Sequence, residues 1–91
     1  MADIIIERIQ DVSDEGFYLV VYDFDLPDSK ARIPTRFFTN LNRIMRKLDD
    51  GNRVQYSVVE CALRKTAEAI KLLATHYNAT AKIYEVKHDD E

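Results

Sequence analysis

The chain has 91 residues, which suits one domain with a modest hydrophobic core. Its hydrophobic content of 46%, with only two Gly and two Pro residues, excludes a disordered chain. The single cysteine, Cys61, excludes an internal disulfide framework and is typical of a reducing compartment. No apolar run reaches the roughly 20 residues that span a bilayer. The start Met1-Ala2-Asp3 lacks the features of a secretory signal, so we expect a cytoplasmic protein with no membrane partner.

Charge is distributed unevenly along the chain. The net charge of −3 weighs slightly against a nucleic-acid partner, but residues 1–28 hold eight acidic side chains and only one basic one, Arg8. Residues 29–48 hold no acidic side chain, and their basic residues are Lys30, Arg32, Arg36, Arg43, Arg46 and Lys47. The sequence therefore predicts a basic element within a mildly acidic protein.

The first half of the chain predicts two strands and a helix. Residues 4–9 are dominated by isoleucine, which favours a short strand. Residues 17–24 form a nearly continuous apolar run, which is typical of a strand covered on both faces. Residues 30–48 have apolar side chains at the helical period, and Pro34 is acceptable only in the first turn of that helix. The segment 49–52 is expected to end the helix.

The second half predicts further strands and a second helix. Residues 53–62 form either one bent strand or two short strands that meet near 55–57. Residues 64–77 have a helical apolar face, and residues 80–86 form a last strand. Residues 87–91 are an acidic tail.

This order of elements predicts an α+β domain over residues 1–91, a ferredoxin-like βαββαβ sandwich with a core at 17–86 and an extra N-terminal strand at 4–9. In that arrangement the strand at 17–24 is central, and other strands of the core already pair with both of its edges. The segment 4–9 must then pair at an edge of the sheet or with a partner chain.

Two aspartates, Asp23 and Asp25, lie at the end of the strand at 17–24. Alternation places both side chains on one side if the strand continues, and two carboxylates at a strand end can hold Mg²⁺. Such a site could activate water for phosphodiester cleavage. The other interpretation is that these residues form a turn and cap the next helix.

The predicted helix at 30–48 carries a stripe of basic residues. Their spacing of 4, 7 and 4 puts Arg32, Arg36, Arg43 and Lys47 on one face. A stripe of this kind fits a phosphate backbone, and an ordinary solvated helix face is the alternative.

Other chemistry-bearing residues favour structural roles. Core packing rather than base stacking is expected to account for the aromatic residues, which fall mostly at predicted core positions: Tyr18, Tyr22, Phe37, Phe38, Tyr56, Tyr77 and Tyr84. Cys61 is expected to be a buried thiol. His76 and His88 have no zinc-ligand spacing, and the chain's glycines, Gly16 and Gly51, make no phosphate-binding loop.

Two segments together resemble a known family. They are Tyr18-Leu19-Val20-Val21-Tyr22-Asp23 and Arg53-Val54-Gln55-Tyr56-Ser57-Val58-Val59-Glu60. The chain resembles the "Cas two" family of small CRISPR-associated adaptation proteins over about residues 17–86. That family has Phe where this chain has Val59, lacks the first 16 residues, and often ends in a strand that crosses onto a partner. The hypothesis is that the predicted strand at 4–9 replaces this crossing strand.

The resemblance implies a ferredoxin-like homodimer that acts with a CRISPR integrase, some members being metal-dependent nucleases. It implies that Asp23 is the catalytic Mg²⁺ ligand near the dimer axis and that Arg32 and Arg36 bind nucleic acid. Our leading expectation is a nucleic-acid-binding homodimer with Mg²⁺-dependent endonuclease activity on RNA or DNA. A non-catalytic DNA scaffold for an integrase and a toxin-like ribonuclease of the same fold are the alternatives.

Overall fold

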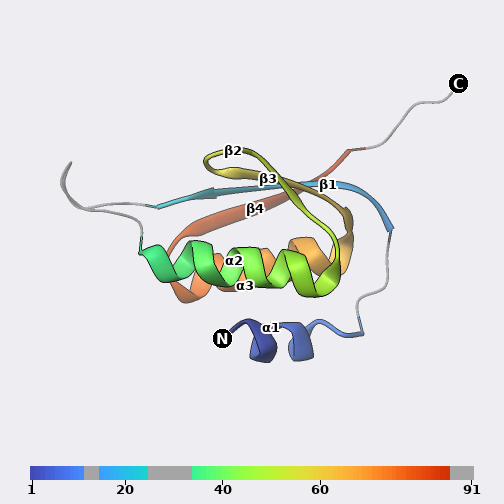
Figure 1. The fold of residues 1–91 in the computed structure, drawn as a ribbon. Coiled ribbons are helices and arrows are strands. Elements are labelled where there is room, and N and C mark those ends of the chain that lie inside the picture. Colours follow the sequence, from blue (N-terminus) through green and yellow to red (C-terminus); the bar gives the residue numbers. More distant parts are fainter. Residues whose placement is uncertain (12–14, 25–33, 87–91) are drawn as a thin grey trace, which may run out of the picture.

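The computed structural model describes residues 1–11, 15–24 and 34–86, and these form three layers (Figure 1). The elements in chain order are α1 (Ala2–Arg8), β1 (Glu15–Asp23), α2 (Thr35–Leu48), β2 (Asn52–Gln55), β3 (Val58–Leu63), α3 (Arg64–His76) and β4 (Thr80–Glu85). The four strands make an antiparallel sheet, α2 and α3 cover one of its faces, and α1 lies beyond these two helices. The described helices include none long and apolar enough to cross a membrane.

The strand order is β2-β3-β1-β4, so β1 is central as predicted. Along β1, Val20 lies opposite Val59 of β3 and Ile83 of β4. The α+β class is confirmed, and the order β1-α2-β2-β3-α3-β4 is compatible with a ferredoxin-like fold. Of the two alternatives for residues 53–62, two strands that meet at a turn is confirmed, because β2 ends at Gln55 and β3 begins at Val58.

The core lies between the sheet and the helix pair. Alternate side chains of β1 point toward the helices, and Tyr18, Val20 and Tyr22 are buried there. They pack with apolar side chains at the helical period of α2 and α3. These are Phe37, Leu41, Ile44, Ala67, Ile70, Leu73 and Ala74. Thr35 begins α2 directly after Pro34, which therefore removes no hydrogen bond from the helix interior.

The predicted N-terminal strand at 4–9 is wrong, because residues 2–8 form the helix α1. Ala2, Ile5 and Ile9 follow the helical spacing and are buried against α2 and α3. A helix of seven residues is marginal alone, so this packing must outweigh the strand preference of its isoleucines. The hypothesis that this segment pairs at a sheet edge is therefore also wrong.

In the part of the chain that the structure describes, helices cover one face of the sheet only. The apolar run of β1 predicted cover on both faces, but its outward side chains, such as Val21 at 36% exposure, have no layer above them among the described residues. We call this helix-free side of the sheet the open face.

Candidate nucleic-acid interface

Asp23 is the last residue of β1, and its side chain is exposed. It pairs through the backbone with Thr80 at the start of β4. Because side chains alternate along a strand, Asp23 is on the open face together with Leu19 and Val21. No described residue forms an ion pair or a side-chain hydrogen bond with its carboxylate. Asp25 lies outside the described residues.

Asp23 suits a hard cation that keeps most of its water. Among the described residues, no group of three or more His, Cys, Asp or Glu side chains gathers at one place in the chain. Mg²⁺ is commonly held by one or two carboxylates, with water and substrate phosphate filling the other positions. One exposed aspartate per chain fits that pattern when a second copy or a nucleic acid supplies further oxygen ligands.

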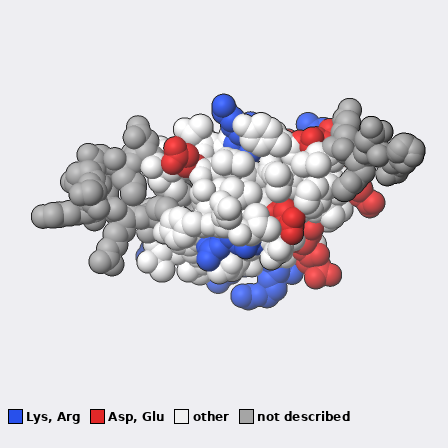
Figure 2. Space-filling model, turned by 90° about the horizontal axis from the view of Figure 1, so that it is seen from above, with Lys and Arg blue, Asp and Glu red and all other residues white. Residues whose placement is uncertain are grey.

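The open face beside Asp23 carries an apolar patch. Strand register places Leu19 beside Tyr84 on one side of β1, and Val21 beside Val58 on the other. These four residues are the open-face patch, and Tyr84 is 51% exposed. Figure 2 views the open face from above, and the side chains over its centre are mostly uncharged. Apolar patches of this kind on a folded protein commonly mark interaction sites.

Two charged residues flank the open-face patch. Glu60 of β3 lies opposite Leu19, and Lys82 of β4 lies opposite Val21. They therefore stand on opposite sides of the central strand. The Asn52 side-chain amide donates a 3.0 Å hydrogen bond to Glu60 Oε2, which holds that carboxylate on the open face.

The basic stripe is only partly available. Arg32 lies outside the described residues, whereas Arg36, Arg43 and Lys47 are exposed on α2. Lys47 Nζ donates a hydrogen bond to Asp3 Oδ1 of α1 and forms an ion pair with it. This hydrogen bond and the charge of Lys47 lower the pKa of Asp3, with a smaller contribution from Arg43. The N-terminal helix thus engages one end of the stripe.

The structure does not bring the whole predicted site together. α2 begins at the end of the molecule where β1 ends, so Arg36 in its first turn shares that end with Asp23 (Figure 1). Arg43 and Lys47 are further along α2, toward α1 and away from the open face. A nucleic acid that contacted both Asp23 and Lys47 would have to wrap around the domain.

Two tyrosines expected in the core are exposed. Tyr56, in the turn between β2 and β3, is 64% exposed, and Tyr84 is on the edge strand β4. For these two residues, the expectation of core packing is wrong. The turn residues around Gln55 were the one signal that could have placed Tyr56 outside, because the tip of a hairpin cannot reach the core.

Cys61 is buried as expected, with 3% exposure. Burial, with a smaller contribution from the charge of Asp50, raises the pKa of its thiol to about 12. A thiol that stays protonated at neutral pH is a poor nucleophile. His76 packs edge-on against Tyr77, and His88 lies outside the described residues.

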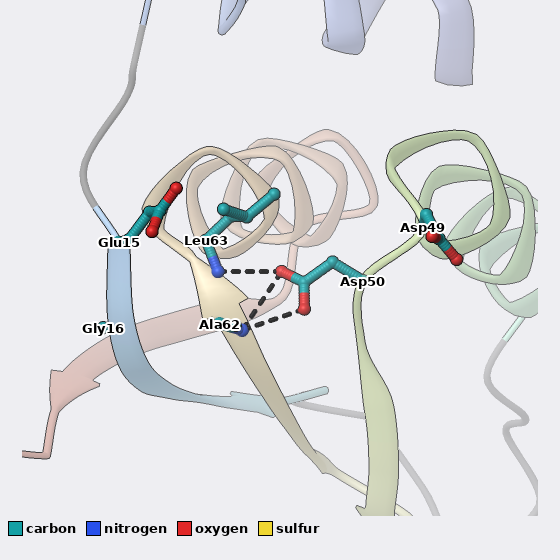
Figure 3. A pocket seen from close by; sticks show the side chains of 6 residues that line it. All are labelled: Glu15, Gly16, Asp49, Asp50, Ala62 and Leu63. Carbon is teal, nitrogen blue, oxygen red and sulfur yellow. Dashed lines mark hydrogen bonds between the residues drawn. The ribbon is translucent and has the colours of Figure 1, made fainter.

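A shallow pocket of about 620 Å³ at the other end of the sheet is acidic but structural (Figure 3). Its lining residues are Glu15, Gly16, Asp49, Asp50, Ala62 and Leu63. The Asp50 carboxylate points inward and accepts hydrogen bonds from the Ala62 and Leu63 N–H groups, whereas Asp49 points away. The Asp50 carboxylate therefore satisfies two backbone N–H groups at the junction of β3 and α3.

Comparison of the chain with models of protein families, with curated proteins and with solved structures finds no match.

Proposed function

We propose that this protein is a cytoplasmic, ferredoxin-like homodimer of the CRISPR adaptation type that binds nucleic acid and cleaves phosphodiester bonds with Mg²⁺. The observation that carries the proposal is the position of Asp23. This exposed aspartate, which has no side-chain partner among the described residues, ends the central strand and shares the open face with the apolar patch. The motif at residues 53–60, to which the resemblance extends, forms the adjacent hairpin.

The open-face patch supports the dimer. The apolar run of β1 has the composition of a strand buried on both sides, and the described chain covers only one side. A second copy stacked on this face would cover the other side. Because Glu60 and Lys82 stand on opposite sides of β1, a two-fold axis through the patch can pair each with its opposite in the partner.

The same stacking would place two Asp23 side chains on one interface. Mg²⁺ supplies the Lewis-acid chemistry for phosphodiester cleavage when it is bound there. Asp23 would hold the cation, and Arg36 at the same end of the molecule would contact a phosphate of the nucleic acid. Arg43 would extend the phosphate contacts along α2.

The dimer is tested by sedimentation velocity. Val21→Glu buries a charge in the proposed interface and is expected to convert a dimer into a monomer. Val54→Glu is the matched control, because Val54 is also an exposed valine (47%, against 36% for Val21) and lies on the edge strand β2, outside the open-face patch. A wild type that sediments as a monomer at all concentrations would refute the dimer.

The catalytic assignment is tested by nuclease assays on single- and double-stranded RNA and DNA. Asp23→Asn keeps the shape of the side chain and removes its charge, so Mg²⁺-dependent cleavage should fall by about 100-fold or more. Asp49→Asn is the matched control, because Asp49 is an exposed aspartate at the far end of the sheet. Full activity of a clean Asp23→Asn preparation would exclude the catalytic role. Cleavage of RNA alone would favour the toxin-like ribonuclease.

A non-catalytic scaffold for an integrase is the second candidate, and the exposed cations of α2 favour it. Residues 35–48 contain no acidic side chain, and Arg36 and Arg43 are exposed. The double change Arg36→Glu and Arg43→Glu should abolish salt-dependent binding to duplex DNA. The scaffold would be supported if the wild type cleaves no nucleic acid and its affinity for duplex DNA falls steeply as the salt concentration rises.

A further inference from the structure

An aromatic and cationic cluster lies at the end of the sheet where β1 ends. Its members are Phe38 of α2, Arg53 of β2 and Tyr56 of the β2–β3 turn, and we call it the stacking cluster. The Arg53 guanidinium lies over the Phe38 ring, 4.8 Å from its centre. The Phe38 and Tyr56 rings are 5.5 Å apart and tilted by 52°. Three separate elements thus bring two rings and one guanidinium together.

The cluster is held in place by the core. The Tyr22 hydroxyl donates a 2.8 Å hydrogen bond to the Tyr56 carbonyl, and the Tyr22 N–H donates one of 3.0 Å to the Ser57 carbonyl. Burial raises the pKa of Tyr22, and the nearby Arg53 acts in the opposite direction. Phe38 is anchored by the buried Phe37, whose ring centre is 5.2 Å away. These contacts position the backbone of the turn and the Phe38 ring before any ligand binds, which lowers the entropy cost of binding.

Core packing alone does not account for the exposure of Tyr56 and Arg53 in the cluster. A tyrosine that only completed a core would be largely covered, but 64% of Tyr56 is exposed. Arg53 is exposed as well, and in the part of the chain that the structure describes no carboxylate forms an ion pair with it. An exposed aromatic face beside a planar cation is the combination on which proteins stack unpaired bases.

Position along the sheet links the cluster to Asp23. The Tyr22 backbone bonds to the turn that carries Tyr56, and Asp23 follows Tyr22 directly. The cluster and Asp23 therefore lie at the same end of the sheet, with Arg53 opposite the buried Val59 on the helix-covered side and Asp23 on the open face. Bases inside a duplex have no free faces to offer, so the cluster favours single-stranded nucleic acid.

We propose that the stacking cluster of Phe38, Arg53 and Tyr56 binds an unpaired base of a single-stranded nucleic acid. The inference rests on the proposed function, because it specifies the form of nucleic acid that reaches the Asp23 end of the protein. Tyr56 supplies the open stacking face, and Arg53 supplies the positive charge and a second planar surface.

The test is titration of a single-stranded oligonucleotide that carries one fluorescent 2-aminopurine base. Stacking quenches this base, so the wild type should show quenching together with binding. Tyr56→Ala is expected to weaken binding about tenfold and to remove the quenching, whereas Tyr56→Phe should keep both. Val54→Ala is the control, because Val54 is an exposed side chain (47%) of the same hairpin that belongs neither to the stacking cluster nor to the open-face patch.

Arg53→Lys is a second variant, which keeps the charge and removes the planar group. It should weaken quenching while the salt dependence of binding stays the same. If wild type and Tyr56→Ala bind and quench equally, or if the wild type binds only duplexes, the inference is overturned and the proposed function stands. If the wild type binds no nucleic acid of any form, both are overturned.

Discussion

Asp50 is expected to stabilise the fold rather than to bind a ligand. Its carboxylate accepts hydrogen bonds of 2.9 and 2.8 Å from the N–H groups of Ala62 and Leu63, just before α3 begins. A hydrogen bond to a charged group contributes about 1.5–3 kcal/mol. Water can replace the bond at the exposed Ala62 amide but not fully at Leu63. Asp50→Ala should therefore lower the free energy of unfolding by about 2 kcal/mol.

The measurement is urea unfolding, supported by hydrogen exchange at the Leu63 amide. Asp50→Asn keeps one acceptor oxygen without the charge, and it should lower the free energy of unfolding by about 1 kcal/mol. Asp49→Asn is the control: Asp49 points away from the pocket, and asparagine tolerates its positive φ of 51°. If Asp50→Ala and Asp49→Asn unfold within about 0.5 kcal/mol of each other, the reasoning is refuted.

Two further predictions concern stability. Gly51 has φ of +126°, and an added Cβ would lie 2.6 Å from Met45 Cγ, so Gly51→Ala should lower the free energy of unfolding by about 2 kcal/mol or more. Gly16→Ala meets only ordinary contacts of 3.5 Å and should change it by less than about 0.5 kcal/mol; equal effects in urea unfolding would contradict this. The raised pKa of Cys61 means that its contribution is complete at neutral pH and is lost as pH rises above the ordinary value of 9.0. Between pH 7 and pH 10 the free energy of unfolding of the wild type should fall by about 1 kcal/mol more than that of Cys61→Ala, and parallel pH profiles would exclude the effect.

The sequence predicted the helices and strands that are determined by the apolar pattern of their own residues, such as β1 and α2. The apolar run ending at Asp23 placed β1 at the sheet centre, and the helical period of Phe37, Leu41 and Ile44 placed α2. Of the site, Asp23, Arg36 and Arg43 were found where a strand end and a helix face should put them, exposed to solvent.

The sequence could not predict features that depend on distant contacts. The isoleucines of α1 are typical of a strand, and only their packing on α2 and α3 makes that segment helical. The partner of Lys47 is Asp3, 44 residues away in the chain, so the basic stripe looked free of counter-charge. Tyr56 lies in a segment whose composition is typical of a strand, but residues 56–57 form a turn that places Tyr56 outside the core.

The central place of β1 has a consequence for folding. Tyr18 pairs with Cys61 and Glu85, which lie 43 and 67 residues further along the chain. The strands that pair with both edges of β1 are therefore synthesised much later than β1 itself. Such non-local pairing slows folding. Until β4 is made, one edge of the most apolar strand stays open to other chains. Pairing with β4 is therefore the step that covers the second edge of β1.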